Sequence, residues 1–333
     1  MPVEAILILF LSTINFIILK NYNYITKKLN IFDIPNEKRK IHSKPTPLFG
    51  GVIIYINIVA FFLFFLFYNF DLILSSFLFS EIKSLNYFFL IISTIFIIGL
   101  YDDKYTVSGI NRIIFLGILI YFSILINHKL EIYDIIFNSI DFSITLSKAS
   151  KIFPLICFLV LIVSCNLGDG INFQSFLFNF FCFLGLFFVE QNLFILTVLF
   201  SLICFGLLNF KGKVFLGDSG SYLLSFLLAF FFIIYYNYNY LGNVETIILF
   251  LFFPVLDATR CILLRLISGR SIMSADNLHL HYILLKKIGY YKTIYILSIF
   301  YSGPFIVLLL DLNLLYFFIL FLIFYLFLIL KFK

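Results

Sequence analysis

Long apolar runs alternate with short polar loops over the whole chain. The hydrocarbon core of a bilayer is about 30 Å thick and needs roughly 20 helical residues, with about 17 to 25 tolerated. The pattern predicts an all-α polytopic integral membrane protein with eleven transmembrane helices, or ten if the marginal fifth run does not cross; the run 72–79 is too short. The predicted spans are 3–20, 50–70, 85–101, 110–127, 151–166, 173–189, 193–210, 220–236, 246–267, 293–310 and 314–331.

The positions of Lys and Arg predict how these spans are oriented. Cytoplasmic loops of membrane proteins carry an excess of basic residues. The sequence predicts that the N-terminus lies outside, since 19 of the 23 Lys and Arg then fall in the inner segments and 4 fall outside. The inner segments are 20–49, 102–112, 166–172, 211–219, 260–292 and the C-terminal tail.

The composition supports a membrane protein and excludes other classes. The 333 residues are 63% hydrophobic and 12% charged, whereas about a quarter of a soluble protein is charged. A disordered chain and a nucleic-acid binder are excluded, since the basic residues are scattered between apolar runs. The five cysteines form no CxxC pattern, so we expect core residues rather than a zinc or redox site. The N-terminal run lacks a basic leader and a cleavage site, which predicts a retained first span.

Polar residues gather at the inner face of the predicted bundle, whereas the outer loops carry mostly Asn, Ser, Tyr and isolated acids. Carboxylates, imidazoles and amides collected at one membrane face indicate a functional site. The residues at this face are Arg39, His42, Asp102, Asp103, Asn166, Asp169, Asp218, Asp276, His279 and His281.

Two acidic loops are candidates for a cation site. Asp102 and Asp103 are adjacent at the end of a span, and their repulsion raises one pKa unless a cation compensates. A hydrophilic turn is the alternative interpretation. The loop 166–172, NLGDGIN, offers amide and carboxylate oxygens, and its glycines let a ligand approach the backbone closely. A simple tight turn would need fewer such groups.

Two further segments favour phosphate binding. Asp218 and Ser219 precede a span, where they either cap the helix or hold a magnesium ion that bridges phosphates. His279 and His281 lie two residues apart, so aiming both at one target requires an irregular backbone. Zinc would need further ligands that the sequence does not place nearby. A wet interfacial loop is the alternative to a phosphate contact.

The remaining charged segments have structural interpretations as well. The segment 38–51, KRKIHSKPTPLFGG, carries basic residues that anchor at the headgroups. Its prolines and paired glycines also predict a specific path of the chain into the bilayer. Asp257 lies inside the ninth span, where a charge must be paired or face water, and Arg260 at i+3 is the expected partner.

In this order and with these spacings, five inner motifs resemble those of the polyprenyl-phosphate N-acetylhexosamine-1-phosphate transferase superfamily. Each motif alone is weak, but five in order are specific. They extend over nearly the whole chain, which implies a single transferase domain over 1–333. Pro254 to Asp257 (PxxD), followed by HxH, looks closer to the initiators of O-antigen synthesis than to the peptidoglycan enzyme. The motifs are RKIHSKPTPLFGG, DDK, NLGDGIN, KVFLGDSGS and GRSIMSADNLHLH.

The resemblance implies an enzyme of the bacterial inner membrane with its active site on the cytoplasmic face. It would transfer a HexNAc-1-phosphate group from a UDP-sugar to undecaprenyl phosphate and release UMP, as the first membrane step of O-antigen or other cell-surface polysaccharide synthesis. The resemblance also implies Mg²⁺, or Mn²⁺ in its place, and leaves a homodimer open. The implied roles are Asp218 with Asn166 for the metal, Asp102 and Asp103 for the lipid phosphate, Asp169, Gly170, Asn172 and Phe215 for uridine, and His279, His281 and Lys44 for the pyrophosphate.

Two departures from the family pattern bear on the choice of sugar. Asn172 stands where relatives often carry Asp; its amide still hydrogen-bonds a base or ribose but adds no charge. Tyr282 stands where relatives carry a further imidazole. We expect a one-step displacement, because the second pKa of a phosphate monoester is near 6 and Asp is a weak base. Asp102 would position or deprotonate the lipid phosphate rather than form an aspartyl-phosphate.

Other classes remain as alternatives. A peptidoglycan-type phospho-MurNAc-pentapeptide transferase shares the motifs. A cation-coupled transporter also has many spans, but its carboxylates lie near the midplane rather than at one interface. A transferase that uses CDP-linked alcohols would carry a series of Asp after Asp169 and Gly170, which is not found. An inactive homologue is a further alternative, although the acidic set lacks only one member, at position 172, where the chain has Asn.

Overall fold

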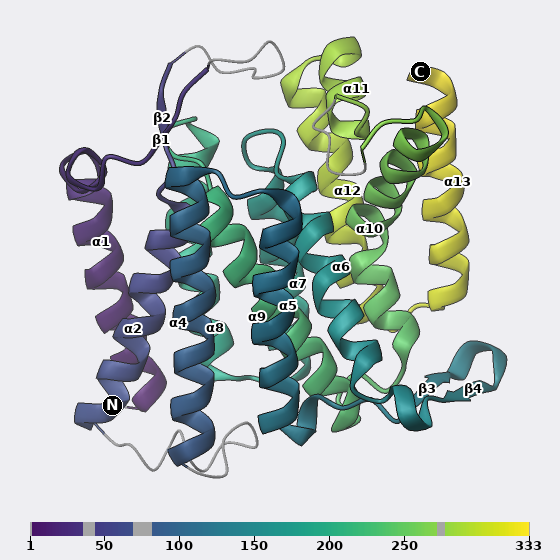
Figure 1. The fold of residues 1–333 in the computed structure, drawn as a ribbon, viewed down its shortest axis with the longest axis horizontal. Helices are drawn as coiled ribbons and strands as arrows, with labels where there is room; N and C mark the ends of the chain where they lie inside the picture. The colour runs from purple at the N-terminus through teal and green to yellow at the C-terminus, as the bar shows by residue number, and fades with distance from the viewer. Residues whose placement is uncertain (1, 36–43, 69–81, 272–276, 333) are drawn as a thin grey trace.

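The computed structural model describes residues 2–35, 44–68, 82–271 and 277–332, which form a bundle of helices (Figure 1). Successive long helices run in opposite directions, so that each loop lies at one of two ends of the bundle. The described helices are α1 (Val3–Leu29), α2 (Gly50–Tyr68), α4 (Ile82–Tyr105), α5 (Gly109–Ile126), α6 (Ile152–Gly168), α7 (Gln174–Val189), α8 (Leu193–Phe210), α9 (Gly217–Asn237), α10 (Val244–Ile267), α11 (Leu280–Ile288), α12 (Tyr290–Leu309) and α13 (Leu314–Phe332).

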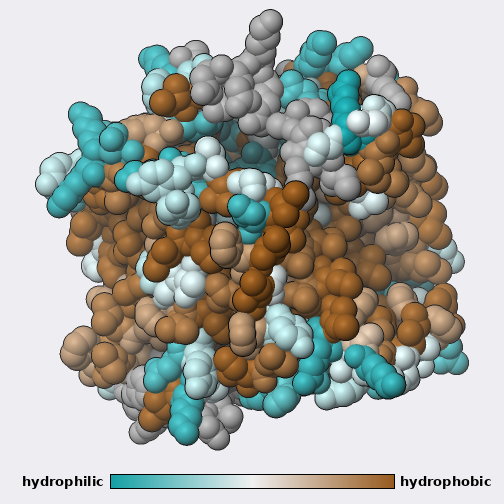
Figure 2. All heavy atoms as spheres, in the orientation of Figure 1, coloured by the Kyte–Doolittle hydropathy of each residue, from teal (hydrophilic) through white to brown (hydrophobic). Residues whose placement is uncertain are grey.

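The chain is a multi-pass membrane protein. Nine of the described helices are long and apolar enough to cross a membrane, which confirms the polytopic prediction. The two other apolar helices, α6 and α7, have 17 and 16 residues. All eleven predicted spans coincide with helices, but the count of eleven stays a prediction because it requires α6 and α7 to cross. Figure 2 shows a largely hydrophobic middle with polar surface towards both ends; the run 72–79 lies outside the described residues.

Helix α9 lies at the centre of the bundle. In its apolar stretch of 18 residues, 94% of the residues are buried, and the helix packs against α2, α4 and α6. Gly99 lets α4 touch the first turn of α9, since a Cβ at Gly99 would lie 2.3 Å from Cα of Ser219. Gly51 gives α2 the same close approach, with a Cβ 2.3 Å from N of Gly220. The first turn of α9 is therefore held between two helices.

Two antiparallel hairpins lie at opposite ends of the bundle (Figure 1). β1 (Phe32–Asp33) pairs with β2 (Thr46–Pro47) at one end. At the other, β3 (Asp134–Phe137) pairs with β4 (Phe142–Thr145). The all-α prediction missed both, because strands of two to four residues are too short for a clear two-residue period. The short 3₁₀ helices beside β3 and β4 are η1 (His128–Leu130), η2 (Asn138–Ile140) and η3 (Ser147–Ala149).

A reciprocal amide pair joins α1 to α2 inside the bundle. Nδ2 of Asn15 donates to Oδ1 of Asn57 at 3.0 Å, and Nδ2 of Asn57 donates to Oδ1 of Asn15 at 2.9 Å. Both side chains are buried. In apolar surroundings each amide satisfies the other, so the pair fixes how the two helices meet.

The five cysteines are free thiols. Cys182, Cys204 and Cys261 are buried, as predicted for core residues, whereas Cys157 and Cys165 are partly exposed. Among the described residues, the one group of side chains that could hold a metal through His, Cys or carboxylate atoms contains no cysteine.

Candidate functional site

A cavity of about 960 Å³ lies at the end of the bundle that carries β1 and β2. Its polar lining comes mainly from the loops that follow α4, α6 and α8. Of the predicted site residues, His281 is buried beside the cavity and Lys44 is exposed outside its lining. The predicted inner-face residues Arg39, His42 and Asp276 lie outside the described residues. The predicted site residues that line the cavity are Asp102, Asp103, Asn166, Asp169, Gly170, Asn172, Phe215, Asp218 and His279.

Asp102, near the end of α4, is held by three groups. Oδ2 of its carboxylate lies 2.9 Å from Nε of Arg112 in an ion pair. The hydroxyl of Tyr222 donates to Oδ2 at 2.6 Å, and the backbone N–H of Val107 donates to Oδ1 at 2.7 Å. Only 2% of Asp102 is exposed. Its carboxylate therefore orients Arg112 and Tyr222, which both line the cavity.

Asp103 caps the amino end of α9. Its Oδ1 accepts from the backbone N–H of Asp218 at 2.6 Å, and Oδ2 accepts from that of Ser219 at 3.1 Å. Gly217, at φ +77°, leaves room for this contact, since a Cβ there would lie 2.7 Å from Oδ2 of Asp103. Asp218 and Ser219 do not cap α9 with their own side chains, as the sequence had allowed, because both lie within its first turn. Because Asp103 occupies these amides, they do not offer a free phosphate site of the kind predicted for a helix N-terminus.

Asp218 and Asn166 meet across the cavity-facing end of the bundle. Nδ2 of Asn166, in the last turn of α6, donates to Oδ1 of Asp218 in the first turn of α9. Both residues line the cavity. The implied proximity of these two side chains is therefore found in the structure.

The loop 166–172 is anchored by residues outside it. Oδ1 of Asn209, in the last turn of α8, accepts from the backbone N–H of Phe173, and its Nδ2 donates to the carbonyl of Val214 at 2.8 Å. The hydroxyl of Tyr290 donates to the carbonyl of Asn172 at 3.3 Å. These contacts join three loops around the cavity. The loop is thus a fixed part of the cavity wall.

Asp169 in this loop is difficult to ionise. Burial and the nearby carboxylate of Asp218 raise the pKa of Asp169 to about 6. A bound cation would favour the ionised form of both carboxylates. Carboxylate and amide oxygens are also the hard donors that Mg²⁺ prefers. The donor set of Asp218, Asp169 and Asn166 therefore fits a magnesium ion.

The entry to α2 pairs with the segment before α9. The backbone N–H of Phe215 donates to the carbonyl of Pro47 at 2.9 Å, and that of Gly50 donates to the carbonyl of Phe215 at 2.9 Å. Leu48 and Phe215 form a parallel β-bridge. The prediction that the prolines and glycines of this segment fix a specific chain path is confirmed. The pairing places Phe215 in the cavity wall.

His279 and His281 stack with 5.4 Å between ring centroids and 12° between ring planes. His279 is extended at φ −60°, ψ 145°, whereas His281 lies in the first turn of α11, which confirms the predicted irregular backbone. His281 packs against the loop 166–172, where a Cβ on Gly170 would lie 2.1 Å from its Nε2. Burial and the neighbouring His279 lower the pKa of His281 to about 3. His281 therefore stays neutral at physiological pH.

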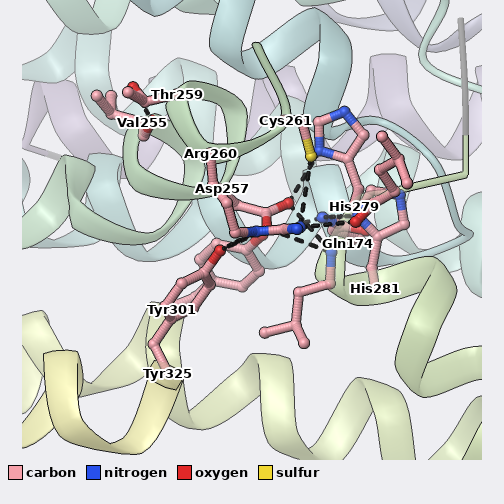
Figure 3. Close-up of polar contacts among 12 residues, drawn as sticks. Gln174, Val255, Asp257, Thr259, Arg260, Cys261, His279, His281, Tyr301 and Tyr325 are labelled. Atoms are coloured by element: carbon pink, nitrogen blue, oxygen red, sulfur yellow. Dashed lines mark hydrogen bonds and ion pairs between the residues drawn. The ribbon is translucent and has the colours of Figure 1, made fainter. Parts of the chain in front are cut away.

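Asp257 joins these histidines to α10 and α13 (Figure 3). Its predicted pair with Arg260 is confirmed, at 2.8 Å between Oδ1 and Nη2. Nδ1 of His279 lies 2.9 Å from Oδ2 of Asp257. Ligand atoms of Asp257, His279 and His281 all lie within 4.8 Å of one another. The contact of Asp257 with the two histidines was not predicted, because Asp257 lies more than twenty residues before both of them in the chain.

Several cavity residues escaped the sequence analysis as site residues. Arg112 is a lone arginine in the first turn of an apolar helix, a signal that could have linked it to the acids just before it. Arg265, near the end of the ninth predicted span, is a charge that must be paired or face water; it is fully buried and lines the cavity. Tyr222 carried no signal, because 21% of the chain is aromatic. Two arginines therefore belong to the lining of the cavity.

One wall of the cavity is apolar and comes from predicted membrane spans. Side chains of α5, α6 and α10 line it beside the charged groups. A ligand with a charged head and a hydrocarbon tail would find both surfaces in the same cavity. The apolar wall residues are Ile113, Leu116, Leu159, Ile162, Val163 and Ile262.

The chain is similar in sequence to known proteins. Residues 85–236 match glycosyl transferase family 4. Over 299 residues the chain is 28% identical to the undecaprenyl-phosphate alpha-N-acetylglucosaminyl 1-phosphate transferase of Thermotoga maritima, which covers 89% of this chain and 85% of that protein. The family match includes the acidic residues around the cavity, from Asp102 to Asp218, but ends before His279.

Proposed function

We propose that this chain, which belongs to glycosyl transferase family 4 and is a distant homologue of the Thermotoga maritima enzyme, transfers a HexNAc-1-phosphate group from a UDP-sugar to undecaprenyl phosphate. UMP is the second product. The site faces the cytoplasm from the inner membrane of a bacterium, and the reaction begins the synthesis of O-antigen or another cell-surface polysaccharide. The orientation follows the excess of Lys and Arg at the end of the bundle that holds the cavity.

The observation that carries this proposal is the meeting of acidic, amide and arginine side chains with an apolar wall in one cavity. The donor is anionic and water-soluble, whereas the acceptor is held in the bilayer at about 0.8 kcal/mol for each buried CH₂. A phosphoryl transfer between them needs a charged site at the membrane surface with an apolar side. The cavity has both surfaces.

Asp218 and Asn166 would hold Mg²⁺, or Mn²⁺, with Asp169 beside them. When bound, the ion supplies compensation for the negative charge that develops on the pyrophosphate, the main requirement of phosphoryl transfer. Arg112 and Arg265 add fixed positive charge to the same cavity. Lys44 is exposed before the start of α2 and lies outside the cavity lining, so it would contact the pyrophosphate only by reaching in from outside.

Asp102 and Asp103 serve the acceptor phosphate by positioning. The carboxylate of Asp102 is engaged by Arg112 and Tyr222, and that of Asp103 by two backbone amides. Asp102 could not take a proton without weakening its contacts. Since the lipid phosphate is largely dianionic at neutral pH, a strong base is not required. One-step displacement follows, with Asp102 holding Arg112 towards the phosphate.

The nucleotide would lie along the loop 166–172. Asp169, Gly170 and Asn172 line the cavity there, and Phe215 offers an aromatic face for the base. Asn172 provides a side-chain amide, and the hydroxyl of Tyr290 holds its backbone carbonyl in place. His279 faces the cavity and would contact the phosphates, while His281 stays behind Gly170.

UMP release by the purified protein in detergent tests the proposal. The assay contains undecaprenyl phosphate, Mg²⁺ and a panel of UDP-sugars that includes UDP-GlcNAc and UDP-MurNAc-pentapeptide. UMP should form with one donor and should disappear without lipid, without Mg²⁺ or in Asp218→Asn. Asp141→Asn, an exposed position at the far end of the bundle, is the matched control and should keep full activity.

Three outcomes would contradict the proposal or a part of it. A folded protein that releases no UMP from any donor contradicts the transferase. Uptake of substrate into vesicles without UMP favours the transporter. A phosphorylated Asp102, trapped with UDP-sugar alone, would replace one-step displacement by a covalent intermediate.

A further inference from the structure

A buried network centred on Asp257 joins Tyr325 of α13 to His279 (Figure 3), and His279 lines the cavity. Asp257 lies in α10 and is 3% exposed. Its Oδ1 accepts from Nη2 of Arg260 at 2.8 Å and from the hydroxyl of Tyr325 in α13 at 2.8 Å. Its Oδ2 lies 2.9 Å from Nδ1 of His279. The backbone N–H of Leu280 donates to both oxygens, at 3.3 and 3.2 Å.

Arg260 and Tyr325 close the network on the side away from the cavity. Nε of Arg260 donates to the hydroxyl oxygen of Tyr325 at 2.6 Å, and its Nη2 also donates to the carbonyl of Leu278 at 2.6 Å. The guanidinium thus contacts α13, Asp257 and the residue just before His279. Because the donors come from α10, α11 and α13, the carboxylate has little freedom to turn.

This arrangement determines which nitrogen of His279 carries a proton. A carboxylate can only accept, so Nδ1 of His279 must donate to Asp257. The other ring nitrogen, Nε2, is buried and has no hydrogen-bond partner among the described residues, while His279 lines the cavity. Nε2 is therefore the atom left for a ligand. It accepts a hydrogen bond when the ring is neutral and donates one when the ring is charged.

The alternative use of these side chains is a metal site, because atoms of Asp257, His279 and His281 lie within 4.8 Å of one another. Both oxygens of Asp257 already accept hydrogen bonds, and the guanidinium of Arg260 lies 2.8 Å from one of them. A divalent cation here would be repelled by that fixed positive charge. The contacts therefore favour an oriented histidine over a metal ligand set.

We propose that Asp257, held by Arg260 and Tyr325, is a positioning residue: Nδ1 of His279 donates to Asp257, which leaves Nε2 towards the nucleotide, where it donates to a phosphate oxygen when the ring carries both protons. His281, which stays neutral, does not share this task. The identity of the ligand rests on the proposed function, but the protonation state of the ring does not. Tyr325 makes the C-terminal helix α13 part of the site, although it lies far from the other motifs in sequence.

Steady-state kinetics of a double-mutant cycle test the positioning role. Asp257→Asn removes a charge-assisted hydrogen bond, so kcat should fall about 10- to 100-fold with a small change in the KM for the UDP-sugar. In a protein that already carries His279→Asn, adding Asp257→Asn should cost less than about threefold more, because the group it positions is gone. An equal loss in both backgrounds would mean that Asp257 only supports the fold.

Tyr325→Phe provides a milder variant in case Asp257→Asn does not fold. It removes a single hydroxyl, should lower kcat about three- to tenfold, and should have no further effect in the His279→Asn background. Tyr235→Phe is the matched control, since Tyr235 is equally buried at the far end of α9. Full activity in Tyr325→Phe would overturn the role of α13.

Nitrogen-15 NMR of histidine-labelled protein tests the protonation state without any enzyme assay. The chain has four histidines, and the His279→Asn spectrum assigns the signal of His279. The wild type should show Nδ1 protonated, and Asp257→Asn should shift His279 towards the other tautomer. A His279 ring protonated only at Nε2 in the wild type would overturn the proposal even if UMP is released.

If UMP is never released but Nδ1 is protonated, the proposed function fails and the positioning remains. Zinc retained by the purified protein through dialysis and lost in Asp257→Asn would establish the metal site instead.

Discussion

Replacing Gly99 by alanine tests whether the contact between α4 and α9 positions Asp218. The new Cβ would lie 2.3 Å from Cα and 2.6 Å from N of Ser219, and 2.9 Å from the carbonyl carbon of Asp218. All three are backbone atoms, so no side chain can rotate away. Ordinary van der Waals contact begins at 3.4 Å, and close-packed helices must therefore separate by about 1.1 Å.

This displacement predicts a large loss of activity with a modest loss of stability. A shift of about 1 Å at a reacting group can cost about 100-fold in rate, and overpacking costs about 1–3 kcal/mol. We expect UMP release by Gly99→Ala to fall about 100-fold, while the protein remains folded with a lower melting temperature in detergent. The displaced turn carries Asp218 and both amides that Asp103 caps.

Gly117→Ala is the matched control. It also places alanine in a membrane-length helix, but its Cβ would lie 3.8 Å from Cδ1 of Leu159, an ordinary contact. Activity and melting temperature should stay close to those of the wild type. If Gly99→Ala and Gly117→Ala were equally active, the approach of α4 to α9 would not position Asp218, and the reasoning would be refuted.

Further predictions concern charge, pH and buried amides. Burial raises the pKa of Asp169 from 3.8 to about 6, so the folded state loses stability as pH rises through this window. Without Mg²⁺ at pH 8, Asp169→Asn should therefore have a higher melting temperature than the wild type and a free energy of unfolding larger by up to about 3 kcal/mol. At pH 4 the two proteins should melt together, and an equal difference at both pH values would contradict the shift. Asp102→Asn should reduce UMP release at least tenfold, since Arg112 loses its ion pair, and Arg112→Gln added to it should cost little more; additive losses would show that the two act separately. Asn57→Leu leaves the buried amide of Asn15 without its partner and should cost about 1–3 kcal/mol in thermal or denaturant unfolding, whereas Asn15→Leu with Asn57→Leu should recover most of it; no recovery would assign the loss to packing.

The positions of the membrane helices could be predicted from the sequence because the bilayer imposes a local rule. Every backbone amide in lipid must be satisfied within its own helix, and a helix must be long enough to cross. Apolar length therefore reports the spans directly, and each predicted run coincides with a helix. The same rule is silent on short polar elements, so the hairpins β1–β2 and β3–β4 and the short helix α11 were missed.

Which residues form the site was partly predictable, because the motifs lie in loops that the distribution of Lys and Arg assigns to the same end of the bundle. Asp102, Asn166, Asp169, Asp218 and His279 do line one cavity. The proximity of Asn166 to Asp218 and the pair of Asp257 with Arg260 were also anticipated. Their chemical roles remain predictions until the assays above are made.

Only the tertiary structure decided which groups each charge meets. Asp103 caps a helix that begins more than a hundred residues later, and Asp257 accepts from Tyr325 in the last helix. Arg112 and Arg265, unremarkable as isolated charges in sequence, become part of the cavity. The physical reason is that apolar length is a property of a segment, whereas ion pairs, proton positions and pKa values depend on distances between segments that the sequence does not state.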